Sequence, residues 1–140
     1  MANIVELREK SDEQLEEMLA NGREEMFNLR FQKAISQLKD GLRIRTVRRE
    51  MAQAQSILGN RQLAIAAAAA QPEVAATLGN SEWDATARYV YEDQGFQVEF
   101  TTNGATVATA LVDLNKKAPK TRRQRDAKAA RQLVTRYEIN

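Results

Sequence analysis

The chain has 140 residues, of which 43% are hydrophobic and 29% are charged, and it contains neither cysteine nor histidine. This length and composition suit one compact globular domain or two small ones. The missing residue types exclude disulfides, thiol nucleophiles, Ser-His catalysis and most transition-metal sites, and no glycine stands in a nucleotide-binding loop motif. We therefore expect no enzyme, no catalytic or metal site, no cofactor and no small-molecule substrate.

The small net charge of +2 hides four blocks of alternating sign. Residues 1–29 and 62–115 are acidic, whereas residues 30–61 hold eight basic and two acidic side chains, and residues 116–140 hold nine and two. Each basic block could bind phosphate groups independently. The N-terminal segment is too charged for a signal peptide, and no apolar run approaches the ~20 residues of a membrane span. A cytoplasmic protein without membrane contact is expected.

The first long helix is predicted to begin at Ser11, whose hydroxyl can accept from backbone N–H groups of the first turn, with Gln14 completing a capping box. Its inner apolar stripe consists of Leu15, Leu19, Met26 and Leu29. Gly22 takes the skipped position of that stripe, where the missing side chain could let a partner helix approach closely. Further apolar surface toward the turn comes from Phe31, Ile35 and Leu38. The turn at Asp40-Gly41 is short, so a second helix should fold back antiparallel on the first.

The second helix combines an apolar seam with arginines. The seam, with spacings of three and four, consists of Ile44, Val47, Met51, Ala54 and Leu58. Arg45 and Arg49 should point away from this seam while Arg43 and Arg48 flank it, so all four guanidinium groups reach solvent or a partner. A solvated charged face is the alternative, but a strip of one sign beside a packed seam is typical of phosphate-binding surfaces. The lack of aromatic residues in this arginine segment favours contacts with the RNA backbone over base stacking.

Three motifs in this region carry a family resemblance. VELREKS at residues 5–11, EMFNLRFQ at 25–32 and RTVRREMAQAQSIL at 45–58 stand in the order and spacing of large-subunit ribosomal protein L-twenty-nine, which residues 1–63 resemble. The resemblance implies a helical hairpin bound to large-subunit ribosomal RNA near the exit of the nascent-peptide tunnel, close to ribosomal protein L-twenty-three. The RNA-facing positions that match the family pattern are Arg30, Arg45, Arg48 and Arg49. Charge alone adds Lys33, Lys39 and Arg43.

An alanine-rich run follows the hairpin. Residues 63–70 can prolong the second helix or act as a spacer, and helix propensity favours the first. Pro72 cannot lie inside that helix, so a boundary falls there, and PEVAATLG is predicted to form a short helix that Gly79 stops. Residues 64–80 are thus expected to be a helical extension or linker with a short helix.

Residues 81–115 change to a period of two, which predicts strands. Asn103-Gly104 between two alternating runs is a strong hairpin signal, and Gly95 is placed in the preceding turn. We expect a three-stranded antiparallel meander. The candidates for its covered face are Trp83, Tyr89, Phe96, Val98 and Phe100. The rival interpretation makes residues 81–93 a capped helix.

Residues 116–140 are strongly basic. A flexible stretch around Pro119 is expected to give way to a helix from about Thr121 that packs on the meander. The inward residues of this helix would be Ala127, Ala130, Leu133, Val134 and Tyr137. Residues expected to bind phosphate are Lys116, Lys117, Lys120, Arg122, Arg123 and Arg125. The alternative is a disordered, solubilising tail.

The predicted fold class is therefore α+β: an antiparallel two-helix hairpin, a small three-stranded meander and a basic C-terminal helix. The predicted function is that of a structural ribosomal component whose arginine-rich helix face binds large-subunit ribosomal RNA, with neighbouring ribosomal proteins as further partners. A coiled-coil adaptor with a peptide- or RNA-binding C-terminal module is the competing hypothesis. The order of elements in the extension also resembles a double-stranded RNA-binding module.

Overall fold

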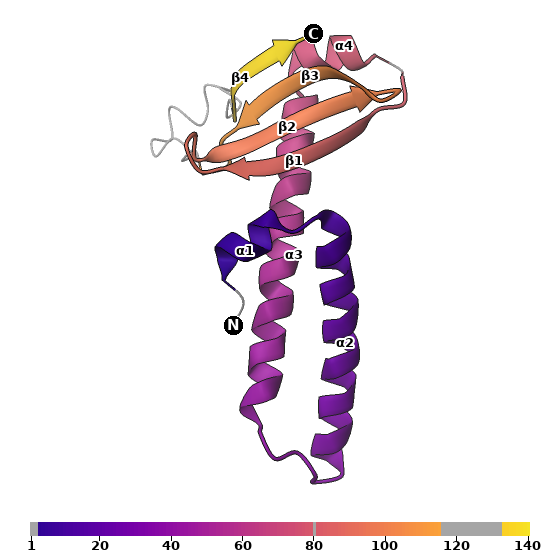
Figure 1. Ribbon diagram of the computed structural model, residues 1–140, viewed down its shortest axis with the longest axis vertical. Helices are drawn as coiled ribbons and strands as arrows, with labels where there is room; N and C mark the ends of the chain where they lie inside the picture. Colours follow the sequence, from indigo (N-terminus) through magenta and orange to yellow (C-terminus); the bar gives the residue numbers. More distant parts are fainter. Residues whose placement is uncertain (1–2, 80, 116–132) are drawn as a thin grey trace, which may run out of the picture. The chain divides into compact units, whose positions relative to one another are not determined.

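The computed structural model of the chain describes residues 3–79, 81–115 and 133–140. The chain divides into two compact units, Met1–Gly59 and Asn60–Asn140. The helices are α1 (Ile4–Glu9), α2 (Asp12–Ala34), α3 (Leu42–Ala69) and α4 (Pro72–Leu78). The strands are β1 (Asp84–Val90), β2 (Gly95–Thr102), β3 (Ala105–Val112) and β4 (Val134–Ile139). The first unit is a helical hairpin and the second is built on an antiparallel sheet, as Figure 1 shows.

The predicted start of the first long helix is confirmed. The Gln14 backbone N–H donates to the Ser11 hydroxyl at 3.3 Å, and the Ser11 N–H donates to the Gln14 side-chain oxygen at 3.2 Å, which together form the capping box. The sequence interpretation missed the short helix α1 before it. Asn3 caps α1 by accepting from the Val5 N–H, and Leu7 of α1 is fully buried. The capping asparagine before an apolar run was the available signal.

The predicted seam between α2 and α3 is also confirmed. Two clusters of buried side chains join the helices, one around Leu15, Leu19, Ala54 and Ile57 with Leu7 of α1, the other around Met26, Leu29 and Val47. Gly22 lies at the close approach, because a Cβ atom at this position would stand 2.7 Å from Cγ of Met51. Helices α2 and α3 run antiparallel beside one another in the hairpin (Figure 1).

The connection between the two helices is longer than predicted. Helix α2 ends at Ala34 and α3 begins at Leu42, so the chain needs seven residues, among them Ser36 with φ of 58°. Asp40 contributes by accepting the Leu42 N–H at 2.8 Å. Phe31 and Ile35 do not continue the buried seam, since they remain 60% and 46% exposed.

The sheet of the second unit has the strand order β1-β2-β3-β4, with every neighbouring pair antiparallel. Asn103 and Gly104 form the two-residue turn between β2 and β3, with φ values of 53° and 82°, as the sequence predicts. Gly95 is not in the preceding turn, because it is the first residue of β2 and Gln94 adopts the positive φ instead. A Cβ atom on Gly95 would meet the Val112 carbonyl oxygen at 2.9 Å, so the glycine allows close strand contact.

One face of the sheet carries the core of this unit. Phe96, Val98 and Phe100 of β2 are buried there, as predicted, and α4 with the last turns of α3 covers them. The covering side chains are Ala64, Ala68, Val74 and Leu78. The Trp83 ring packs edge-on against Phe100 with ring centroids 5.4 Å apart. The alanine-rich run does prolong the second helix, and α4 ends at Gly79.

Three sequence predictions for this unit are wrong. The sheet has four strands instead of three, and residues 134–139 form β4 where a C-terminal helix was expected. The rival helix over residues 81–93 is also wrong, because β1 occupies most of that range. Leu133, Val134 and Tyr137 fit a helical period, but β3 offers Val134 and Tyr137 a strand to pair with, and β-branched and aromatic residues favour strands. The remainder of the expected helix, residues 116–132, lies outside the described residues.

The structure describes the chain up to Asn115, beyond the end of β3, and again from Leu133, where it pairs with the sheet. The Asp113 N–H donates to the Leu133 carbonyl oxygen at 2.9 Å, and Val112 pairs with Val134. The basic block therefore lies between two neighbouring strands along the sequence.

Candidate nucleic-acid interface

A groove with basic walls runs along one flank of the α2–α3 seam. The volume of this groove is about 470 Å³. Its lining residues are Arg23, Met26, Phe27, Arg30, Arg48, Met51, Ala52 and Gln55. We call it the basic groove. The lining contains three arginines and no carboxylate, so this surface attracts anions.

Helix periodicity explains how the basic groove is built. Arg23, Phe27 and Arg30 are spaced by four and three residues and so share one flank of α2. Arg48 and Gln55 do the same on α3, where Ala52 between them leaves space. Met26 and Met51 come from the seam itself and form the floor. The α2 and α3 side chains thus form the two walls of the groove, and the two methionines form its apolar floor.

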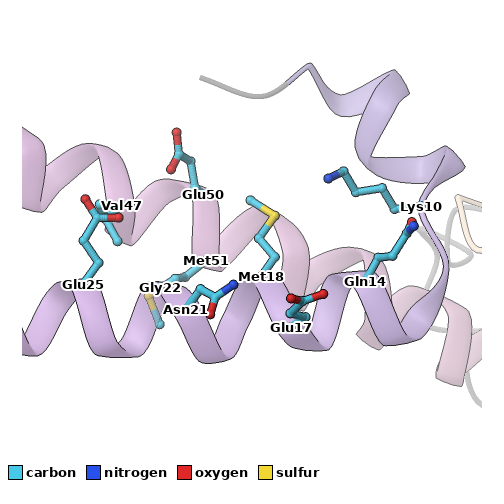
Figure 2. A pocket seen from close by; sticks show the side chains of 10 residues that line it. All are labelled: Lys10, Gln14, Glu17, Met18, Asn21, Gly22, Glu25, Val47, Glu50 and Met51. Carbon is cyan, nitrogen blue, oxygen red and sulfur yellow. The ribbon is translucent and has the colours of Figure 1, made fainter.

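The opposite flank of the seam has a groove of the same volume, about 470 Å³, but of opposite character. Figure 2 shows its lining, which comes from Lys10 just before α2, from the first half of α2 and from α3. The lining residues are Lys10, Gln14, Glu17, Met18, Asn21, Gly22, Glu25, Val47, Glu50 and Met51. We call it the acidic groove, since it has three carboxylates and one lysine. No acidic cluster among the described residues is arranged to hold a metal ion.

Arg43 belongs with the carboxylates and not with the other arginines. Its Nε donates to Glu25 Oε1 at 2.6 Å, and the hydrogen bond and charge of Glu25 raise the pKa of the guanidinium. Glu25 also lines the acidic groove. The structure therefore separates Arg43 from Arg48, although both were predicted to flank the seam on a common phosphate-binding face.

The other predicted contact residues of the hairpin are all exposed. Arg30 and Arg48 line the basic groove from α2 and α3 respectively, and Arg45 and Arg49 continue the positive surface around α3. Lys33 lies in the last turn of α2 and Lys39 in the connection to α3. The predicted contacts Lys116, Lys117, Lys120, Arg122, Arg123 and Arg125 lie outside the described residues.

The sequence analysis did not single out Arg23 or Phe27, which also line the basic groove. Arg23 precedes the basic block and stands among acidic residues, so a count of charge along the chain does not single it out. Its spacing of four and seven residues from Phe27 and Arg30 was the signal that could have found it. We define the basic face as Arg23, Arg30, Arg45, Arg48 and Arg49.

The uncovered face of the sheet is polar but has no single sign. Along β1 to β4, Arg88 pairs with Gln97, and Leu111 pairs with Arg136. The neighbouring row contains Glu99 and Glu138, each paired with a threonine. Positive charge is therefore more concentrated on the hairpin than on the described part of the sheet. No helix among the described residues is sufficiently long and apolar to cross a bilayer.

Comparisons with known proteins identify the family of the N-terminal part of the chain. Residues 5–61 match the model of the family described as Ribosomal L29 protein. The large ribosomal subunit protein uL29 of Mycobacterium ulcerans is 47% identical over 68 residues, which cover 49% of this chain and 85% of that protein. The uL29 protein of Mycobacterium tuberculosis is 51% identical over 61 residues, covering 44% of this chain and 79% of that protein. For Mycolicibacterium smegmatis uL29 the identity is 46% over 68 residues, covering 49% and 88%.

The matched region coincides with the hairpin, and the sheet-bearing remainder lies largely beyond it. The match covers most of the length of each relative at close to half identity. The chain therefore belongs to the uL29 family of structural, non-enzymatic proteins of the large ribosomal subunit.

Proposed function

We propose that the hairpin binds large-subunit ribosomal RNA through its basic face, near the exit of the nascent-peptide tunnel of the cytoplasmic ribosome. The observation that supports this most directly is the sorting of charge across the seam: three arginines and no carboxylate line one groove, and three carboxylates line the other. A merely soluble helix pair mixes both signs on both flanks. Membership of the uL29 family of large-subunit ribosomal proteins supports ribosomal RNA as the polyanion that this face binds.

The proposed mechanism is charge neutralisation on a rigid scaffold. Each guanidinium displaces counterions from the RNA backbone and can bind a phosphate with two parallel hydrogen bonds. The packed seam, with Val47 and Ala54 almost fully buried, fixes the distance between arginines on the two helices. Affinity should then depend on salt and on the shape of the folded RNA.

The acidic groove would face away from the RNA in this arrangement, because phosphates repel carboxylates. It is left for neighbouring ribosomal proteins, and we propose L-twenty-three as one neighbour at the tunnel exit on the family resemblance. We also propose that the basic residues from Lys116 to Arg125 add a second, peripheral set of phosphate contacts.

Assembly into ribosomes tests the proposed function. Full-length chains carrying Arg45→Gln, Arg48→Gln and Arg49→Gln together should sediment with large subunits at clearly reduced occupancy. The matched control removes the same charge outside both grooves, with Arg8→Gln, Arg88→Gln and Arg136→Gln, and should assemble like the natural chain. Equal occupancy of the two triple variants would contradict RNA binding through the basic face.

A further inference from the structure

Phe27 lies in the basic groove, where binding of phosphates alone gives it no role. Its side chain is 70% exposed although it lies between two arginines of α2 and beside the methionine floor. A phenylalanine that stays largely in water forgoes the stabilisation that burial of its ring would provide. An isolated exposed aromatic residue is ordinary, but one that lines a groove with arginines on both walls points to a ligand.

The groove has the dimensions and chemistry of a site for one flat, anionic group. Its volume of about 470 Å³ lies within the range of ~300–1,000 Å³ found for small-molecule sites. Met26, Met51 and Ala52 give an apolar base, and Arg23, Arg30 and Arg48 stand around it. Gln55 supplies an amide that can both donate and accept. No carboxylate lines the groove to repel an anion.

A nucleotide combines the two properties that this lining favours. Its base has an aromatic face that stacks on phenylalanine or on a guanidinium plane, and its phosphate binds arginine. An acidic peptide would match the arginines but leaves the exposed ring and the apolar floor without a specific partner. The acidic groove, which shares Met51 as part of its floor and has the same volume, offers carboxylates instead and serves as an internal contrast.

We propose that the basic groove receives one unpaired base of the ribosomal RNA, which stacks on Phe27 while Arg23, Arg30 and Arg48 bind the adjoining phosphates. This inference rests on the proposed function, because it concerns the same face of the hairpin. It changes one expectation from the sequence: the arginine segment of α3 has no aromatic residue, but α2 places one in the same groove as Arg48. The groove would bind only where the RNA offers an unstacked base, whereas Arg45 and Arg49 outside the groove would contact the RNA backbone.

Substitution of Phe27 in the full-length chain tests the site, with protein-free large-subunit ribosomal RNA of Mycolicibacterium smegmatis as the probe. Phe27→Leu and Phe27→Ala should each weaken binding about tenfold, since one base stacked on an aromatic ring contributes ~1–3 kcal/mol. Phe27→Trp should restore the affinity. The slope of log affinity against log salt should stay unchanged in all three variants, because no phosphate contact is removed.

Chemical probing of the same complexes gives the second readout. The natural chain and Phe27→Trp should protect the base edge of one unpaired nucleotide that Phe27→Leu leaves reactive. Natural affinity and natural protection in both Phe27→Leu and Phe27→Ala would overturn the site, as would loss of another ribosomal protein from the assembled subunit without any change in the RNA. Failure of the broader proposal looks different: the natural chain itself would then show a salt slope near zero.

Discussion

A single missing side chain, at Gly22, sets how closely the two helices of the hairpin approach each other. Glycine in a helix interior costs roughly 0.5–1 kcal/mol against alanine, so its presence needs a reason. The reason is steric: a Cβ atom would stand 2.7 Å from Cγ and 3.2 Å from the sulfur of Met51. Gly59 in α3 has nothing within 4 Å of that position and provides a natural comparison.

These two glycines should respond in opposite directions to the same change. Gly59→Ala should raise the free energy of unfolding by about 0.5–1 kcal/mol, because helix propensity improves without a clash. Gly22→Ala should lose that gain and fall below the natural chain, since Met51 must move out of the seam. Urea denaturation followed by helical circular dichroism measures both. Equal stabilisation by the two substitutions would show that the helices do not touch at Gly22.

Glu73 should make the stability of the second unit depend on pH, and the direction of its pKa shift sets the sign of this dependence. A hydrogen bond from its own backbone N–H is the first cause that lowers the pKa of this carboxyl below its usual 4.5, followed by the amide of Gln71, which donates at 2.9 Å. Since the folded pKa is lower than the unfolded one, the stabilisation is complete above about pH 4.5 and disappears as the pH falls through the folded pKa.

Thermal unfolding between pH 6 and pH 3 should therefore show a decline that is smaller in Glu73→Gln than in the natural chain. The effect should be small because the carboxyl is exposed. An identical decline in both proteins would remove Glu73 as a contributor.

At the scale of elements, prediction succeeded where the cause is local. Ser11 with Gln14, Pro72 with Gly79, and Asn103 with Gly104 each set a boundary through hydrogen bonds or backbone angles within a few residues. It failed at β4, because the same apolar spacing fits a helix or a strand and the choice depends on pairing with β3, distant in sequence. The Ser36 positive φ and the long α2–α3 connection were likewise not marked by glycine.

The two sides of β4 should differ in how strongly a charged substitution destabilises the sheet unit. Val134 is 6% exposed and packs with the cluster beneath the sheet, so Val134→Asp would bury an unpaired carboxylate. We expect a loss on the order of 3 kcal/mol or more from the free energy of unfolding of the sheet unit. Arg136→Asp on the exposed side of the same strand should change it by no more than about 0.5 kcal/mol. Similar effects of the two substitutions in a urea titration would contradict the orientation of β4.

At the scale of the whole molecule, charge segregation along the sequence becomes segregation between surfaces. Counting charges along the sequence predicted a basic block at residues 30–61, and Arg30 and Arg48, which were predicted to face RNA, do line one groove. Counting could not show that Arg43 pairs with Glu25, nor that Arg23 from an acidic stretch joins the basic side, since both depend on how α2 and α3 pack. The family match accounts for the hairpin, whereas the sheet lies beyond it and was predictable only from its alternating pattern.

The central claim is that the basic face binds ribosomal RNA by neutralising phosphates. Its most direct test is the salt dependence of binding between the full-length chain and large-subunit ribosomal RNA. Each phosphate contact adds ~0.7–0.9 to the negative slope of log affinity against log salt. Replacing Arg45, Arg48 and Arg49 with glutamine should make the slope less negative by about 2 to 3 and weaken binding. The control triple at Arg8, Arg88 and Arg136 should leave the slope close to that of the natural chain. An unchanged slope and affinity after loss of the three basic-face arginines would contradict the account.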